Sequence, residues 1–285
     1  MLKLDEKKIR KGKPLGLPYQ GSKKKISKKI VEIIKQNFGT DKVIYDVFGG
    51  GGAITAECLL NNLNVIYNDL NKEVTDMFQR VISQDREWIK TLIVSREEFF
   101  EIKNKVTKTV DDNLKLLINS FGNNKRTYLY SEEWSDMKYN LAIEIINKHD
   151  VFSGYKQTDI YRKTRTVNGD QLGQLQRLQQ LERLQQLGQL QPTNLSYEAF
   201  SNVEGAIFYL DPPYENTTHE TYNGEFDSQK FYDWAYKMSK KNIVIVSSYE
   251  ISDDRFKCVY EFEKARSTIQ SGTAVNRTEK LFMVV

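Results

Sequence analysis

Histidine, cysteine and proline are scarce in this chain of 285 residues, which has two histidines, two cysteines and five prolines. The two cysteines, Cys58 and Cys258, are too few for the disulfide framework of a small secreted domain, and we expect both to be reduced. Without clustered His and Cys the usual ligands of a zinc site are missing, so we expect no metal-dependent mechanism. Apolar runs of about 18 residues and a signal-peptide pattern are also missing. These absences predict a cytoplasmic protein without a membrane segment.

Hydrophobic residues make up 39% of the chain, which is enough for a sizeable core. The net charge is only +4, but the first thirty residues hold eleven Lys and Arg against Asp5 and Glu6. Such a basic stretch could neutralise phosphates of a nucleic acid. It could equally be the solvated face of a lysine-rich helix, and both interpretations stay open.

A tetrapeptide, Asp211-Pro212-Pro213-Tyr214, follows the strand-like run at 206–210. Open α/β folds place their chemistry at the carboxyl ends of strands. The two prolines stiffen the turn, so the Asp211 carboxylate, the Pro212 carbonyl and the Tyr214 ring are expected to face one small volume. Two acceptors and an aromatic face suit an exocyclic amine on a flat heterocycle. The alternative is a proline-rich turn capped by Asp.

A glycine loop, Gly49-Gly50-Gly51-Gly52, lies between a strand-like run at 43–48 and a helix-like run at 53–60. Glycines after a buried strand let the backbone approach a ligand closely. The Lys-Ser/Thr ending of a triphosphate loop is absent. A third strand-like run at 64–68 ends in Asp69, where nucleoside-binding α/β folds place the acceptor for ribose hydroxyls. The order of strand, glycines, helix, strand and acid predicts a nucleoside-type site.

From about residue 91 to 193 the α/β alternation stops. Within this segment leucines recur at a strict interval of three between Gln171 and Gln191. Three residues advance an α-helix by about 300°, so the stripe drifts around the helix and forms no single apolar face. A helix buried on changing sides, a coil of short turns, a spacer or a repeat without a fixed role are the possible interpretations.

The alternation of helix-like and strand-like segments returns after residue 194. An amphipathic helix is predicted over 228–240, with Phe231, Trp234, Ala235 and Met238 facing the core. Strand-like runs follow at 242–248, 257–262 and 280–284 and are expected to complete a mostly parallel sheet.

Three segments resemble the Dam-type, or D12-class, site-specific DNA adenine N6-methyltransferases of bacteria and phages: Pro18 to Lys23, Asp46 to Gly52, and Asp211 to Tyr214. The resemblance implies an α/β fold, with a Rossmann-like S-adenosylmethionine-dependent methyltransferase sheet and a mainly helical target-recognition insert. It divides the chain into a catalytic core of residues 1–90 and 194–285 and an insert of residues 91–193, which includes the repeat at 171–191. The middle of the chain resembles these methyltransferases only weakly.

The resemblance implies S-adenosylmethionine as cofactor and gives catalytic roles to Asp211, Pro212 and Tyr214. Adenine, rotated out of the duplex, would rest on the Tyr214 ring while Asp211 and the Pro212 carbonyl accept its two N6 hydrogens. Direct in-line transfer to that nitrogen needs no covalent intermediate. The cofactor residues implied by the matched motifs are Tyr19, Lys23, Asp46, Phe48, Gly49, Gly51, Asp69 and Asp211.

The implied partner is double-stranded DNA, and we expect a monomer, as in a phage or restriction-modification methyltransferase. A polar and aromatic turn within the insert suits contacts to phosphates and base edges. The residues proposed for DNA contact are Asn123, Asn124, Lys125 and Arg126 in that turn, and Arg266 and Arg277 in a polar loop before the last strand. The target sequence stays open.

Three alternatives remain at this point. Cytosine N4-methyltransferases share this geometry, but the first residue of their tetrapeptide is more often Ser, so Asp211 favours adenine. RNA and protein amide methyltransferases usually carry Asn there. A DNA-binding protein that retained the fold without catalysis would be expected to have damaged motifs, and both motifs are intact.

Overall fold

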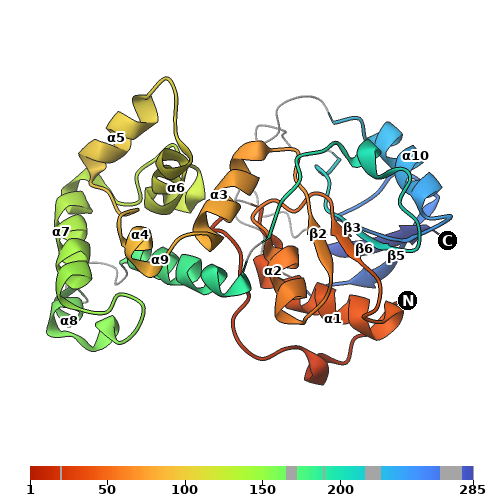
Figure 1. Cartoon of the computed structure of the whole chain (residues 1–285), viewed down its shortest axis with the longest axis horizontal. Helices are drawn as coiled ribbons and strands as arrows, with labels where there is room; N and C mark the ends of the chain where they lie inside the picture. Colours follow the sequence, from red (N-terminus) through yellow and green to blue (C-terminus); the bar gives the residue numbers. More distant parts are fainter. Residues whose placement is uncertain (20, 165–171, 189, 216–225, 264–277, 285) are drawn as a thin grey trace.

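The computed structural model describes residues 1–19, 21–164, 172–188, 190–215, 226–263 and 278–284. A six-stranded sheet with its helices forms one half of the molecule, and a group of helices forms the other half (Figure 1). The strands are β1 Ile44–Asp46, β2 Val65–Tyr67, β3 Ile207–Leu210, β4 Ile243–Ser248, β5 Phe256–Glu261 and β6 Lys280–Val284. This confirms the predicted α/β class and a Rossmann-like sheet.

The strand order in the sheet is β2-β1-β3-β4-β6-β5. β2, β1, β3 and β4 pair in parallel, whereas β6 is antiparallel to both β4 and β5. The prediction of a mostly parallel sheet is therefore correct. Because β1 and β3 are neighbours although about 160 residues separate them, the glycine loop and the Asp211 turn both leave the same edge of the sheet.

Side chains that alternate along β3 fill two different cores, as the pleat of a strand requires. Ile207 and Tyr209 pack with helices α1, Ser27–Phe38, and α2, Ala53–Leu60. Phe208 and Leu210 face the other way and pack with α10, Ser228–Met238. Both faces of the strand are covered, which is why its sequence reads as a continuous apolar run.

The other half of the molecule is helical. Its helices are α4 Arg86–Lys90, α5 Arg96–Asn104, α6 Val110–Asn119, α7 Glu132–Lys148, α8 Asp159–Thr164 and α9 Gly173–Leu184. Helix α3, Lys72–Ile82, lies between the halves and contributes Met77, Phe78 and Val81 to the same core as α6 and α9. Short 3-10 turns are η1 Glu6–Lys8, η2 Lys23–Lys25, η3 Phe121–Asn123, η4 Tyr155–Gln157, η5 Gln185–Leu187 and η6 Tyr197–Phe200.

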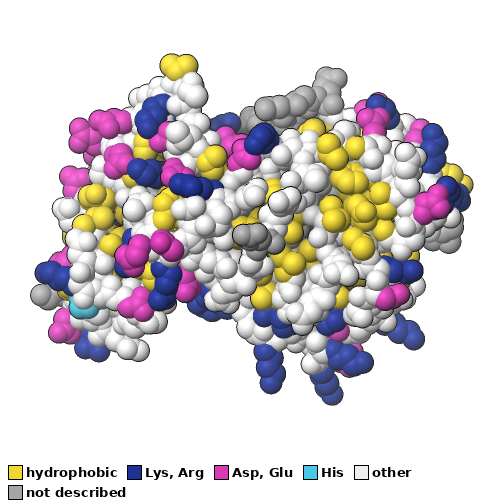
Figure 2. Space-filling model, in the orientation of Figure 1, with side chains coloured by type: hydrophobic (Ala, Val, Ile, Leu, Met, Phe, Trp, Pro, Cys, Tyr) yellow, Lys and Arg dark blue, Asp and Glu magenta, His cyan; other side chains and the backbone are white. Residues whose placement is uncertain are grey.

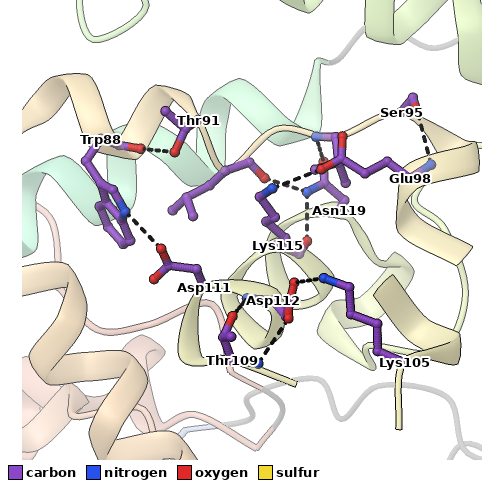
Figure 3. A network of polar contacts seen from close by, with 12 residues as sticks. Trp88, Thr91, Ser95, Glu98, Lys105, Thr109, Asp111, Asp112, Lys115 and Asn119 are labelled. Carbon is purple, nitrogen blue, oxygen red and sulfur yellow. Dashed lines mark hydrogen bonds and ion pairs between the residues drawn. The ribbon is translucent and has the colours of Figure 1, made fainter. Parts of the chain in front are cut away.

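A network of polar contacts fixes the start of α6 against α4 and α5 (Figure 3). Thr109 and Asp112 form a reciprocal capping box, which satisfies backbone N–H groups that the first helical turn leaves unpaired. Lys105 pairs with Asp112 at 2.8 Å, and the Trp88 indole donates to Asp111 at 3.3 Å. The helical half is thus held by its own caps and ion pairs as well as by its apolar core.

The central part of the leucine repeat forms helix α9, which is buried on changing sides, so the first of the four interpretations is correct for that part. The leucines at 172, 175, 178, 181 and 184 are all fully buried. Gln180 on α9 accepts a hydrogen bond from Lys24 Nζ at 2.9 Å, and the same ammonium donates to the Gly16 carbonyl at 3.2 Å. Helix α9 therefore ties the helical half to the N-terminal segment, whose Leu17 N–H donates to the Gly51 carbonyl of the glycine loop.

Lys and Arg side chains project along the lower edge of the α/β half, where the N-terminal segment and α1 lie (Figures 1 and 2). Part of the basic stretch is nevertheless occupied within the fold: Arg10 pairs with Glu57 at 2.8 Å, and Lys29 pairs with Glu6 at 2.5 Å. The basic N-terminus therefore includes structural contacts as well as exposed charge. Both cysteines are free, as expected; Cys58 is buried and Cys258 is exposed.

Candidate active site

A cavity of about 440 Å³ lies at the carboxyl ends of β1, β2 and β3. This volume is within the usual range for small-molecule sites. All the residues predicted to bind the cofactor line the cavity: Tyr19, Lys23, Asp46, Phe48, Gly49, Gly51, Asp69 and Asp211. Pro213 lines it as well, whereas Tyr214 is directed to a polar cluster beside it. Residues from three distant parts of the sequence thus meet around one space.

The glycine loop is shaped by close backbone packing. A Cβ atom on Gly49 would lie 2.5 Å from the Tyr67 ring, and one on Gly51 would lie 2.7 Å from Tyr19 Cβ. Gly52 has a φ of 70°, which L side chains rarely adopt. The backbone follows the cavity wall closely because these positions carry no side chain. The loop's fourth glycine also marks the start of α2.

Asp69 holds the backbone of the glycine loop at the cavity wall. Its carboxylate accepts hydrogen bonds from the backbone N–H of Gly50 and of Asn71, both at 2.8 Å. Burial raises the pKa of Asp69, while these two backbone donors oppose the rise. Each carboxylate oxygen has a second acceptor position, so Asp69 can hold the glycine loop and still bind a ligand hydroxyl.

Asp46, at the end of β1, is a buried carboxylate beneath the glycine loop. Asp46 Oδ2 accepts from the Thr55 backbone N–H at 3.0 Å and from the Thr55 hydroxyl at 2.6 Å. Burial raises the pKa of Asp46 to about 7, although both hydrogen bonds from Thr55 lower it. The contacts fasten α2 to β1 and so fix the position of the loop between them.

An aromatic wall closes another side of the cavity. The Phe48 ring lies 6.2 Å from the Tyr197 ring and 6.1 Å from the Phe226 ring, measured between centroids, and all three residues line the space. Leu70 and Leu195 also line it, and both are exposed to solvent. The cavity therefore offers an apolar, aromatic region as well as its acidic residues.

A polar cluster surrounds Asp211, which also lines the cavity. Lys23 Nζ lies 2.8 Å from Asp211 Oδ2 and 3.8 Å from Glu279 Oε1. The Tyr214 hydroxyl contacts Asp211 Oδ1 at 2.9 Å and also Glu279 Oε1. Lys23 Nζ is 4.9 Å from the centre of the Tyr214 ring, and the Tyr249 ring meets that ring edge-on at 4.8 Å. In this structure both the ring and the hydroxyl of Tyr214 are thus engaged by protein groups.

Sequence reasoning missed Glu279 and Ser247 as members of this cluster. Glu279 is 8% exposed, and its Oε1 accepts from the Ser247 hydroxyl at 2.7 Å. The sequence signal is an acid that stands immediately before the predicted strand at 280–284. That position alone does not reveal burial, because the partners of Glu279 come from β4, the Asp211 turn and η2.

A model of the D12 class N6 adenine-specific DNA methyltransferase family matches residues 19–273. The match spans the glycine loop, the helical insert and the Asp211 turn. The chain belongs to this family. It is accordingly an adenine-specific DNA methyltransferase, and the Dam-type resemblance of the sequence is confirmed.

Among solved structures, the rRNA methyltransferase aviRa from Streptomyces viridochromogenes is similar, with 12% identity and a TM-score of 0.37. The similarity covers 90% of this methyltransferase and 84% of the other chain. No curated protein matches the sequence.

Within this methyltransferase, the polar turn predicted to contact DNA follows α6. Lys125 Nζ pairs with Glu73, a residue at the start of α3 that lines the cavity. Asn124 Oδ1 accepts from the backbone N–H of Arg126 at 2.8 Å, and Asn123 and Lys125 both have φ of 57°. Phe121 is exposed at the same turn. The turn therefore lies beside the cavity rim. Arg266 and Arg277 lie outside the described residues.

In the described part of the chain, none of the helices has the length and apolar character needed to span a bilayer. The same residues include no group of three or more His, Cys, Asp or Glu arranged to hold a metal ion.

Proposed function

We propose that this methyltransferase transfers the methyl group of S-adenosylmethionine to N6 of an adenine that is rotated out of a specific double-stranded DNA sequence. The observation that carries the proposal is one cavity that is lined by the glycine loop, Asp69 and Asp211 together. A cofactor held by the glycine loop and Asp69 and an amine held by Asp211 would meet inside one space.

The cavity's lining residues fit this cofactor. Asp69 provides an acceptor for ribose hydroxyls, and Phe48, Tyr197 and Leu70 provide apolar surface for a flat base. Gly49, Gly50 and Gly51 line the cavity with backbone alone, and added Cβ atoms at Gly49 and Gly51 would collide with Tyr67 and Tyr19. When bound, S-adenosylmethionine supplies an electrophilic methyl group on a positively charged sulfur.

Asp211 and the Pro212 carbonyl would hold the target amine as hydrogen-bond acceptors. Lys23 and Tyr214 already occupy one position on each oxygen of Asp211, and each oxygen can accept a second hydrogen bond. Holding both N6 hydrogens orients the nitrogen lone pair toward the methyl group, so catalysis comes from positioning and electrostatics. The Tyr214 ring would support the adenine once Lys23 shifts from its face.

The insert of residues 91–193 would recognise the target, with residues 1–90 and 194–285 as the catalytic core. Asn123, Asn124, Lys125, Arg126, Arg266 and Arg277 would contact DNA. We further propose that the protein acts as a monomer in the bacterial cytoplasm, as part of a phage or restriction-modification system.

Cofactor binding can be tested by calorimetric titration of S-adenosylmethionine into the wild type, Asp69→Ala and Asp76→Ala. Asp76 is a matched control because it is an acid of α3 whose contact is an exposed ion pair with Lys72. Loss of a charged hydrogen-bond partner is expected to weaken binding by roughly tenfold or more in Asp69→Ala. Equal affinities in all three proteins would contradict the proposed role of Asp69.

Base rotation has its own test. Once the target sequence is known, 2-aminopurine can replace the target adenine, and its fluorescence should rise when the protein binds because the base leaves the stack. Fluorescence that stays quenched in a bound complex would contradict base rotation.

A further inference from the structure

The polar turn that follows α6 has a closed base. Ser120 and Tyr128 form an isolated antiparallel bridge, and beside it the Leu129 N–H donates to the Asn119 carbonyl at 2.8 Å. We call these four residues the neck of the turn. The turn beyond the neck includes Lys125, whose side chain pairs with an acid of the cavity lining. Where the turn lies relative to the cavity therefore depends on how the neck is held.

Helix α9 holds both sides of the neck through Gln174. The amide nitrogen of Gln174 donates to Asn119 Oδ1 at 2.6 Å and to the Tyr128 hydroxyl at 3.2 Å. Gln174 and Asn119 are fully buried, and Tyr128 is 2% exposed. A buried polar group that loses its partner is costly, so these contacts favour one arrangement of the neck against α9.

Arg177, one triplet further along the leucine repeat, binds the backbone of the neck. One of its terminal nitrogens donates to the Ile118 carbonyl and, at 2.8 Å, to the Ser120 carbonyl. The last carbonyls of a helix have no partner within it, and a cation there also compensates the helix dipole. Burial lowers the pKa of Arg177 to about 10, so the guanidinium is charged at neutral pH. The end of α6 and the neck are thus held by charged hydrogen bonds, which are stronger than neutral ones.

The same helix is anchored to the α/β half. Gln180 accepts from Lys24 Nζ at 2.9 Å, and Lys24 follows Lys23 of the cavity lining. Gln174, Arg177 and Gln180 are the middle residues of consecutive triplets of the repeat. Because three residues advance a helix by about 300°, successive middle residues point about 60° apart, and one helix can contact both the neck and the N-terminal segment. Figure 1 shows α9 extending from the helical half toward the α/β half.

We propose that Arg177 is a positioning residue for target binding, which holds the neck and so fixes the polar turn relative to the active site. Helix α9 is the rigid connection between the two. The leucine repeat thereby gains a function: its leucines bury the helix, and the middle residues of its triplets join the turn to the α/β half. The role in target binding rests on the proposed contact between the turn and DNA. The hold on the turn does not.

Amide hydrogen exchange resolved by residue tests the hold on the turn without DNA. Arg177→Met keeps the length of the side chain but removes its donors, so the N–H groups of Phe121 and Leu129 at the neck should exchange roughly tenfold faster or more. Exchange in β3 should not change. Arg177→Lys can still donate to the carbonyls and should keep most of the protection. Arg183→Met is the matched control, because Arg183 lies two triplets beyond Arg177 on the same helix.

Two results would overturn the hold on the turn. One is unchanged exchange at the neck in Arg177→Met, and the other is exchange that is accelerated equally in β3, which would show a general loss of stability. If Arg177→Met does not fold, Gln174→Met serves the same test, since Gln174 binds both sides of the neck.

The effect on target binding is tested together with Lys125→Ala. Fluorescence anisotropy measures the affinity of Arg177→Met, Lys125→Ala and the double variant for a DNA duplex of mixed sequence. Each single substitution should weaken binding by roughly threefold or more. If Arg177 acts through the turn, the double variant loses no more than the larger single effect, because the displaced turn already lacks its phosphate contact. The affinity of Arg177→Met for S-adenosylmethionine, measured by calorimetric titration, should equal that of the wild type.

Additive losses in the double variant, or a weakened cofactor affinity in Arg177→Met, would overturn the role in target binding. If Lys125→Ala binds DNA as tightly as the wild type, the proposed DNA contact of the turn fails instead, and hydrogen exchange still decides whether Arg177 holds the turn.

Discussion

Single carboxylates in this enzyme have different tasks because their surroundings differ. Asp69 accepts from two backbone N–H groups, whereas Asp46 accepts from one threonine and is almost completely enclosed. Asp211 lies beside both a cation and a second acid. The sequence predicted Asp69 and Asp211 from their places after strands and Asp46 from the family resemblance, but the surroundings of each depend on contacts that only the fold brings together.

Asp46 should make stability depend on pH. Its pKa is about 7 in the fold against an ordinary 3.8, so between these values the folded protein holds a proton that the unfolded chain releases. The free energy of unfolding must therefore fall as pH rises through this window. Asp46→Asn should reduce the fall between about pH 5 and about pH 8 by on the order of 1–3 kcal/mol. Denaturant unfolding of both proteins across this range measures it, and identical slopes would contradict the burial of a titrating Asp46.

At the scale of elements, the sheet was predictable and the leucine repeat was not. The helix after the glycine loop begins and ends at the predicted residues, Ala53 and Leu60, and each strand lies within two residues of its predicted bounds. Periodicity succeeds there because each element has a definite buried face. A helix with leucine at every third position has no single apolar face. It can bury all of its leucines only when other elements surround it. Those neighbours are distant in the sequence.

Helix α9 should be essential for stability. Leu181 is fully buried, so Leu181→Ala removes buried methyl groups and leaves a cavity, at an expected cost of about 2–5 kcal/mol in the free energy of unfolding. Gln186→Ala, in the exposed part of η5, is the control and should change stability by no more than about 0.5 kcal/mol. Comparable denaturation midpoints for the two variants would show that the repeat is not a packed part of the core.

At the scale of the whole molecule, the helical insert meets the cavity rim. Lys125 in the turn after α6 pairs with Glu73 at the start of α3, and α9 contacts Lys24, the neighbour of Lys23. A duplex bound by the insert would thus lie close to the opening of the site. The sequence could not predict this proximity, because the contacts of the insert join residues far apart in the chain.

If the turn contacts DNA, Lys125→Ala should weaken binding across sequences and lower the dependence of log affinity on log salt by about one unit. Lys148→Ala is the matched control, since Lys148 is exposed at the end of α7 and pairs with Glu144 on its own helix. Fluorescence anisotropy at several salt concentrations measures both slopes. Equal slopes for the two variants would exclude a phosphate contact by Lys125.

Methyl transfer tests the central claim most directly. Unmethylated genomic DNA is incubated with labelled S-adenosylmethionine and either the wild type or Asp211→Ala, and the product nucleosides are separated. The proposed mechanism predicts label in N6-methyladenine with the wild type and a loss of roughly a hundredfold or more with Asp211→Ala, because the amine loses its charged acceptor. Label that persists at the wild-type rate in Asp211→Ala, or that appears in N4-methylcytosine, would contradict it.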